Sequence, residues 1–325
     1  MRPEGYVPRD AALDGHLVSA KAFRAQLRLI KKLYRVITPE AFRLWLKNRE
    51  PWPSPSILLT CDDGLQNVLT DMLPVLMEED LHCLFFVTGA SAGEVRTKLW
   101  YEELFLLFLE ARAGRFDISD EAIRIQGDLG TVEQRRAAWW DAVRRLSGQE
   151  AETRDSVIRA LRGYFSIEAR PEPGSASASC RRFTLLTATE IRQLTSCGMS
   201  VGAHSMSHPI LSLLAPELAY AEISGSKSAL ESVLGTAVWA FAYPFGDPQS
   251  VNAEVVKMAQ EAGFEAACTN FGGGFGAALP QFSLPRLHIT ADMTLAELEA
   301  HVSGFHRRLQ RYAGRSSEPL TVAQA

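Results

Sequence analysis

The sequence lacks the features that mark membrane-spanning and secreted proteins. No uninterrupted apolar stretch reaches the roughly 20 residues that a helix needs to cross a bilayer. The most apolar run, residues 104–109, is closely bracketed by Glu102, Glu103 and Glu110. The opening residues 1–5 contain no apolar signal-peptide region. We therefore expect a cytoplasmic protein without a transmembrane segment.

Positive charge, paired cysteines and nucleotide motifs are also scarce. The formal net charge is −4, without the basic excess typical of proteins that bind nucleic acid, so we expect no nucleic-acid partner. The five cysteines are odd in number and form no C-x-x-C pair, which favours free thiols in a reducing compartment. The glycine-rich residues 272–276 lack the Lys-Ser/Thr of a phosphate-binding loop.

Two short motifs, far apart in the chain, combine carboxylates with imidazoles. Asp62 and Asp63 follow a short apolar run that predicts a buried strand. His204 follows a second such run, and His208 lies four residues later, a spacing that we expect to place both rings on one side of a helical turn. Two strand ends of one parallel sheet can converge on a metal ion. One carboxylate would then remain as a general base.

These motifs resemble those of the polysaccharide deacetylase family, the NodB-like carbohydrate esterases of family 4. Residues 60–64 are similar to the family's T-F-D-D-G, with cysteine in place of the aromatic residue. Residues 204–209 match H-[ST]-x-x-H-P, and residues 241–246 resemble the third motif in its F-A-Y-P-[YF]-G form. The resemblance covers roughly residues 17–92 and 183–300.

The alternation of strands with helices predicts a parallel sheet that closes into a barrel. The resemblance implies an α/β fold, a distorted (β/α) barrel of about seven strands, in residues 1–92 and 183–313. Residues 93–182 carry long helical patterns and no convincing strand, so we expect a helical insertion there. Residues 314–325 are expected to be a disordered tail. The family's first strand, with its Tyr-His pair, is not recognisable, so we expect either that the chain is trimmed or that its barrel is incomplete at that edge.

The resemblance implies that Asp63, His204 and His208 are metal ligands. Three protein ligands leave coordination positions open for water and substrate, as a catalytic metal requires. Zinc is the expected ion, although an Asp/His/His set also accepts cobalt and other divalent ions.

The same resemblance implies catalytic roles for residues around these ligands. Asp62 is the expected general base, which would take a proton from the attacking water. The element Tyr243-Pro244-Phe245 is expected to contact substrate, with the backbone N–H of Phe245 as a donor to the oxyanion. His288 is the candidate acid for the leaving amine, and a structural role for it is equally open.

Two positions depart from the family's pattern. Ala242 replaces the arginine that usually precedes the third-motif proline by two residues and orients the base. The chain also reads Arg286-Leu287-His288 near the last strand, where the family pattern is L-x-H. Because alternate residues of a strand face the same side, Arg286 and His288 should point together. We hypothesise that Arg286 supplies the missing cation beside Asp62.

The resemblance implies a metal-dependent hydrolase that removes N-acetyl groups from amino sugars. The expected partner is an N-acetylated carbohydrate, in a polysaccharide, an oligosaccharide or a lipid-linked precursor. Three alternatives stay open: a small-molecule amide hydrolase on the same scaffold, an iron oxygenase with two histidines and one carboxylate, and a non-catalytic sugar-binding relative.

The aromatic residues of the insertion allow two interpretations. Trp100, Tyr101, Trp139 and Trp140 could line a sugar-binding wall, or they could form the insertion's own core, which is favoured. The apolar run 104–109 is compatible with a lid, a dimer interface or a membrane-facing platform. Peripheral membrane contact and the oligomeric state therefore stay open.

Overall fold

A computed structural model gives the fold of the chain. It describes residues 1–8, 17–48, 55–119, 123–167, 177–271, 280–291 and 293–305. The expected tail and the glycine-rich residues 272–276 lie outside the described residues.

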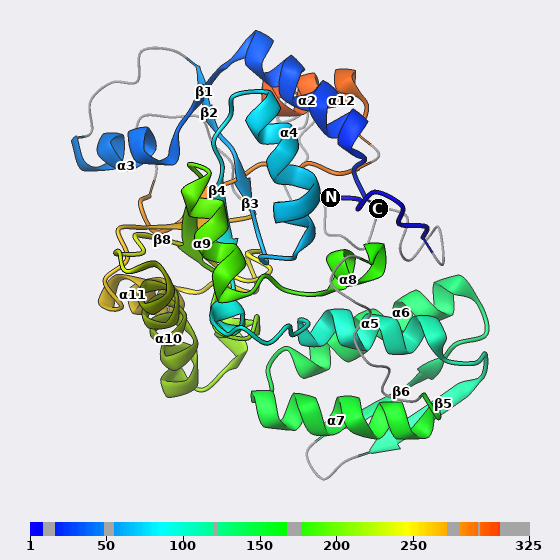
Figure 1. Ribbon diagram of the computed structural model, residues 1–325. Helices are drawn as coiled ribbons and strands as arrows, with labels where there is room; N and C mark the ends of the chain where they lie inside the picture. The colour runs from blue at the N-terminus through cyan, green and yellow to red at the C-terminus, as the bar shows by residue number, and fades with distance from the viewer. Residues whose placement is uncertain are drawn as a thin grey trace.

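A six-stranded parallel sheet forms the centre of the larger body (Figure 1). Its strand order is β10-β9-β8-β7-β4-β3, and the pairings between neighbours are parallel. The six strands are β3 (Thr60–Cys61), β4 (Leu84–Val87), β7 (Ser200–Ala203), β8 (Ala240–Ala242), β9 (Ala266–Thr269) and β10 (Leu284–Pro285). A second parallel pair, β1 (Arg35–Ile37) and β2 (Ser56–Leu58), lies just before β3 in the chain. The predicted (β/α) barrel class is confirmed, and the described strands outside the inserted segment form one sheet of six and one pair.

The sheet is buried on both faces, which explains the continuous apolar runs of its strands. All four residues of β4 are buried. Phe85 and Val87 join the larger core cluster, whereas Leu84 and Phe86 join a smaller cluster that includes Leu46. Alternate residues of one strand therefore fill the two cores, as the pleat of a strand requires.

Helices and short helical turns surround this sheet (Figure 1). The α-helices are α2 (Ala20–Leu33), α3 (Pro39–Asn48), α4 (Leu73–Glu78), α9 (Ala188–Ser196), α10 (Pro216–Leu234), α11 (Ala253–Glu261) and α12 (Leu295–Val302). Three shorter turns are η1 (Val68–Met72), η2 (Gly89–Ala92) and η3 (Leu211–Leu213). Hydrogen bonds at the helix starts fix several boundaries: Ser19 caps α2, and Thr187 with Glu190 forms a capping box on α9.

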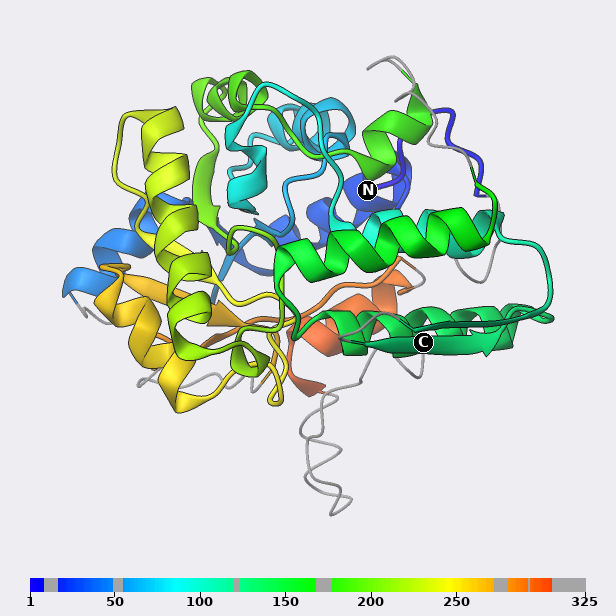
Figure 2. The same ribbon diagram turned by 90° about the horizontal axis from the view of Figure 1, so that it is seen from below.

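The segment predicted as an insertion forms a lobe beside the barrel (Figures 1 and 2). Its helices are α5 (Trp100–Glu110), α6 (Val132–Leu146), α7 (Ala151–Tyr164) and α8 (Ala178–Phe183). The expectation that it contains no strand was wrong, because β5 (Arg115–Ser119) and β6 (Arg124–Asp128) form an antiparallel hairpin. Each strand is five residues long and buries one large apolar residue, Phe116 or Ile125. The alternation of apolar and polar residues in strands this short is too brief to identify them from the sequence.

The apolar run 104–109 lies largely inside this lobe. Leu104, Phe105, Leu107 and Phe108 are all buried, and three of them join Trp100 in the lobe's core cluster. The run therefore packs the lobe instead of forming an exposed apolar platform. Among the described residues, no helix has both the length and the apolar character needed to span a bilayer.

The five cysteines are unpaired, as expected. Burial raises the pKa of the Cys61 thiol to about 12 and that of Cys268 to about 11. Thiols that stay protonated at neutral pH are poor nucleophiles and poor metal ligands. Cys61, beside the Asp-Asp pair, is therefore a packing residue.

Candidate metal centre

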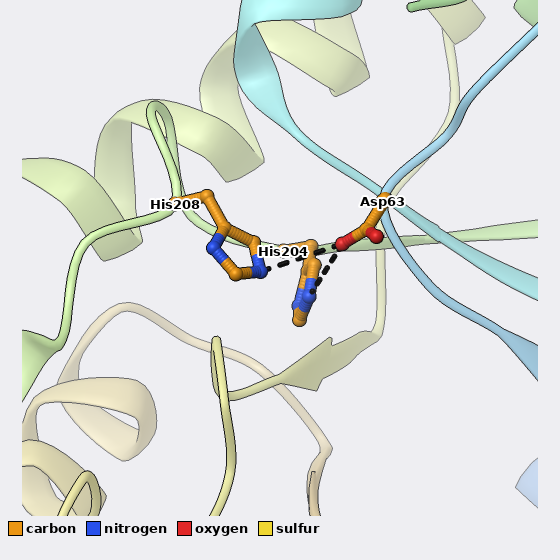
Figure 3. Close-up of side chains that lie close together, drawn as sticks. All are labelled: Asp63, His204 and His208. Carbon is orange, nitrogen blue, oxygen red and sulfur yellow. Dashed lines mark ion pairs between the residues drawn. The ribbon is translucent and has the colours of Figure 1, made fainter. Parts of the chain in front are cut away.

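The predicted ligands meet at one edge of the central sheet (Figure 3). Asp63 follows β3, whereas His204 and His208 follow β7. Both strands are neighbours of β4 in the sheet. The carboxyl ends of parallel strands meet at the same edge, so the strand pairing brings residues about 140 positions apart into contact.

The three side chains converge on a single carboxylate oxygen. Asp63 Oδ1 lies 3.5 Å from His204 Nε2 and 3.4 Å from His208 Nε2. The candidate ligand atoms all lie within 4.8 Å of one another. Both histidines are buried, and Asp63 is half-buried. A single ion could therefore contact all three side chains.

The expectation that the two histidines share a helical turn was wrong. Residues 204–210 form an irregular loop, in which Ser205 and His208 have left-handed φ angles of 59° and 58°. The carbonyl of Ser205 accepts a hydrogen bond from the N–H of Gly89 at 2.8 Å, and its hydroxyl accepts one from the N–H of His208 at 3.0 Å. Spacing of four residues suits this loop as well as it suits a helix.

The hydrogen bonding of His204 suits a metal ligand. Its Nδ1 lies 2.7 Å from the carbonyl oxygen of Ala242. Because a carbonyl can only accept, Nδ1 carries the proton of a neutral ring and Nε2 presents a lone pair. That lone pair faces the Asp63 carboxylate, and two acceptors at this distance need a proton or a cation between them. Metal-bound histidines are typically oriented in this way by their second nitrogen.

His208 differs from His204 in this respect. Its Nδ1 is buried, with no hydrogen-bond partner among the described residues. Its ring is instead held by aromatic neighbours: Phe245 lies 5.0 Å away and Tyr101 lies 4.9 Å away between ring centroids. The ring is thus fixed by packing. An Asp/His/His donor set of this kind fits zinc and similar divalent ions.

The electrostatics keep Asp63 in the ionised form that binds a cation. Burial alone would raise the pKa of Asp63, but its interactions with the neighbouring imidazoles of His204 and His208 hold it well below its ordinary value. Burial lowers the pKa of His208. For His204, the carboxylates of Asp62 and Asp63 outweigh burial and raise the pKa.

Asp62 is paired with Arg286, in the position hypothesised from the sequence. Arg286 Nη1 lies 2.5 Å from Asp62 Oδ1 and Nη2 lies 2.6 Å from Oδ2. The guanidinium also donates to Asn270 Oδ1 at 2.7 Å. Burial alone would raise the pKa of Asp62, but Arg286 outweighs it and the pKa is lowered. Asp62 is therefore ionised at neutral pH, 3.9 Å from His204 Nε2.

The third motif divides between core and site. The Tyr243 ring is buried in the core cluster, and its hydroxyl donates to the carbonyl of Phe282 at 3.0 Å. Pro244 is also buried. Phe245 has a left-handed φ of 61°, and its carbonyl accepts a hydrogen bond from Asn270 at 2.9 Å. Among the described residues, no acceptor takes the N–H of Phe245.

His288 lies just beyond β10, and its side chain is exposed. Within the described part of the chain it makes no hydrogen bond or ion pair with Asp62, Asp63 or either ligand histidine. Its position near the last strand is the one that the sequence indicates, and its role stays a prediction.

Three residues of the inserted lobe contact the ligand residues or the loop between them, and the sequence did not predict these contacts. The hydroxyl of Tyr101 donates to Asp63 Oδ2 at 3.0 Å. Trp100 Nε1 donates to the carbonyl of His208 at 3.1 Å. Arg154 donates to the hydroxyl of Ser207. The aromatic residues are partly in the lobe's core, as favoured, yet Trp100 and Tyr101 also hold the ligand residues in place.

Comparison with known proteins extends the motif evidence. Residues 167–267 match the sequence profile of the polysaccharide deacetylase family. The matched segment includes both histidines and the third motif, whereas Asp62, Asp63 and Arg286 lie outside it. YxkH of Bacillus subtilis (strain 168), assigned by name to the polysaccharide deacetylases, is 22% identical over 117 residues. That alignment covers 36% of this chain and 41% of YxkH, so the chain matches about two fifths of that relative's length.

Solved structures share the fold. The Streptococcus pyogenes deacetylase PplD, determined in complex with acetate, superposes with a TM-score of 0.57 at 19% identity, over 91% of this chain and 92% of PplD. IcaB from Ammonifex degensii gives a TM-score of 0.51 at 17% identity, over 87% of this chain and 89% of IcaB. With the profile match, these structures confirm the resemblance to the polysaccharide deacetylase family.

Proposed function

Since the chain shares the fold and the motifs of the polysaccharide deacetylases, we propose that it is a metal-dependent N-deacetylase. Its substrate would carry N-acetylated amino sugars, in a polysaccharide, an oligosaccharide or a lipid-linked glycan precursor. The observation that carries this proposal is the convergence of Asp63, His204 and His208, with Asp62 held ionised beside them. The family match supports deacetylase chemistry.

Asp63, His204 and His208 would hold the divalent ion, for which zinc is the expected identity and cobalt an alternative. When bound, such an ion polarises a carbonyl group and lowers the pKa of a water molecule towards about 7. Three protein ligands leave room for water and substrate. The pairing of His204 with the carbonyl of Ala242 supports this role, because it directs the Nε2 lone pair towards the site.

Asp62 would act as the general base. Arg286 contacts both of its oxygens, and each carboxylate oxygen retains a second lone pair that can accept a proton. The guanidinium keeps Asp62 ionised and fixes the plane of the carboxylate. Asp62 is thereby oriented to take a proton from the water that attacks the acetamide carbonyl carbon.

The backbone N–H of Phe245 would stabilise the oxyanion that this attack creates. Its freedom from other acceptors among the described residues supports the role. The buried Tyr243 and the hydrogen bond from Asn270 fix the backbone on either side. Loss of one such donor typically costs about 3–4 kcal/mol of barrier stabilisation. His288 stays the candidate that protonates the leaving amine.

The test is acetate release from short N-acetylglucosamine oligomers, by metal-stripped protein and by protein reloaded with zinc or cobalt. We expect no release after stripping and full recovery on reloading. Asp62→Asn should lower the rate by about 10²–10⁴-fold, because it removes the general base, while the variant still binds metal. Asp80→Asn is the matched control, since Asp80 is an exposed aspartate with a left-handed φ of 52° and should retain the full rate.

Each other outcome overturns part of the proposal. Metal binding without acetate release would indicate a different amide substrate. A chain that binds no metal would be a non-catalytic relative. Turnover that requires oxygen would indicate an oxygenase.

A further inference from the structure

Asp63 is held from two sides by different parts of the chain. Its Oδ1 faces His204 and His208, which belong to the barrel. Its Oδ2 accepts a hydrogen bond of 3.0 Å from the hydroxyl of Tyr101. Tyr101 lies in the first turn of α5, in the inserted lobe. The two oxygens of this carboxylate therefore have different environments.

The Tyr101 ring has little freedom to move. It packs against the imidazole of His208 at 4.9 Å and edge-on to Trp100 at 5.8 Å, between ring centroids. The backbone carbonyl of Tyr101 accepts a hydrogen bond from Trp139 Nε1 at 3.4 Å. Because a tyrosine side chain has only two rotatable angles, these contacts fix the direction in which the hydroxyl points.

The backbone of Asp63 does not restrain its carboxylate in the same way. Asp63 has a left-handed φ of 75°, and its carbonyl accepts a long hydrogen bond of 3.5 Å from Thr88 Oγ1. Within the described part of the chain, Tyr101 is the donor to Oδ2. Without that hydroxyl, the carboxylate could turn and offer either oxygen, or both, to a cation.

We propose that Tyr101 is a positioning residue, which holds Asp63 Oδ2 so that Oδ1 alone faces the two imidazoles. This inference rests on the proposed metal-dependent function. Carboxylates that bind metals are themselves usually hydrogen-bonded, and loss of such a partner typically costs about 10–100-fold in metal affinity or activity. Tyr101 thus links the inserted lobe to the ligand set.

The chemical type of the partner separates the two adjacent aspartates. Arg286, a cation, neutralises Asp62 and holds both its oxygens. Tyr101 is a neutral donor, so it orients Asp63 without compensating its negative charge. The full charge of Asp63 therefore remains available to a divalent ion.

Zinc titration of metal-stripped protein, by competition with a chromogenic chelator, tests the inference without using activity. Tyr101→Phe removes the hydroxyl and keeps the ring that packs on His208. We expect its zinc affinity to fall by about 10–100-fold. Tyr164→Phe is the matched control, because Tyr164 lies on α7 of the same lobe and is 53% exposed. Its zinc affinity should equal that of the unmodified protein.

The visible absorption of cobalt-loaded protein provides a second measurement, because it reports the number and geometry of the ligands. Release of Oδ2 in Tyr101→Phe should change the cobalt bands, whereas a residue with a merely structural role would leave them unchanged. Equal zinc affinity and identical cobalt bands in Tyr101→Phe would overturn this inference alone. Failure of the unmodified protein to bind either metal would overturn the proposed function instead.

Discussion

The candidate metal site has two walls that are built differently. On the barrel side, the ligands and Arg286 lie in the segments that follow strands of the central sheet. On the lobe side, Trp100 and Tyr101 open helix α5 and contact residues that already belong to the barrel. The barrel therefore determines which groups face the site, and the lobe determines how those groups are oriented.

The two walls also differ in charge. The barrel wall concentrates ionised groups, with Asp62, Asp63 and Arg286 within a few residues of strand ends. The lobe wall reaches the ligand residues themselves through neutral donors, an indole N–H and a phenol, whereas its cation Arg154 contacts Ser207 in the loop between the two histidines. Changes in the barrel wall should consequently have the larger effects on stability, and changes in the lobe wall should act mainly on geometry.

The largest effect on stability is expected from Arg286→Ala, which would break the barrel wall. It leaves the Asp62 carboxylate without its cation in a site where Arg286 is only 12% exposed, so the free energy of unfolding should fall by about 3–5 kcal/mol. Urea denaturation measures this loss. Arg43→Ala is the control, because its pair with Glu265 is about 30% exposed on both sides and should contribute at most about 1 kcal/mol. Equal losses of unfolding free energy in Arg286→Ala and Arg43→Ala would contradict the prediction that the pair of Arg286 with Asp62 stabilises the fold more than the exposed pair does.

A smaller effect is expected from Trp100→Phe, which tests the lobe wall. This variant leaves the carbonyl of His208 without its indole donor, at a cost of about 1–3 kcal/mol for an unsatisfied buried acceptor. Trp239→Phe is the control, because Trp239 is equally buried, at 7% exposed, and lies outside the site. Urea denaturation of both variants separates the hydrogen bond from the loss of ring area. If Trp100→Phe and Trp239→Phe lower the free energy of unfolding equally, the hydrogen bond from Trp100 to the carbonyl of His208 does not stabilise the fold.

The smallest effect on stability is expected for the ion pair that joins the segment leading into the lobe to the barrel. Arg96, just before α5, donates two hydrogen bonds to Glu190 of α9, at 2.6 and 3.0 Å. Burial alone would raise the pKa of Glu190, but the bonds from Arg96 and Thr187 outweigh it and lower the pKa. The ionised form is thus favoured by folding. The contribution of the Glu190 carboxylate to the free energy of unfolding is fully present above the unfolded-state pKa of about 4.3. It is lost as the pH falls through the lower pKa of the folded state.

Glu190→Gln should accordingly cost about 1 kcal/mol at pH 7, and the difference from the unmodified protein should shrink as the pH falls below about 4. Urea denaturation at a series of pH values measures it. Glu299→Gln, at an exposed position of α12, should show no such trend. If the difference in the free energy of unfolding between Glu190→Gln and the unmodified protein does not change with pH, the charge of Glu190 does not stabilise the contact between the lobe segment and the barrel.

Much of the barrel wall could be predicted from the sequence, because strand ends are local signals. Apolar runs that stop at Asp62 and at His204 indicate both where the strands end and which edge of the sheet they share. Arg286 could be predicted beside Asp62 because Ala242 leaves the base without its usual cation. That pairing is present, although its role in catalysis remains a prediction.

The lobe wall could not be predicted, because it depends on how two separate cores pack together. Tyr101 and Asp63 are 38 residues apart, and nothing in their local patterns relates them. The loop that carries His208 was wrongly expected to be helical, because a spacing of four residues does not distinguish a helix from a loop with left-handed residues. The β5–β6 hairpin was missed because its strands are too short to produce clear periodicity.

The left-handed backbone of the site has a consequence for protein engineering. Asp63, Ser205, His208 and Phe245 all have positive φ angles, a conformation that costs non-glycine residues of order 1–3 kcal/mol each. The surrounding fold imposes these conformations, so they are not a property of the side chains. Grafting the three ligand side chains onto a barrel with ordinary loops would therefore fail to reproduce their convergence. A transplant of this centre must carry the loop backbones along with the ligands.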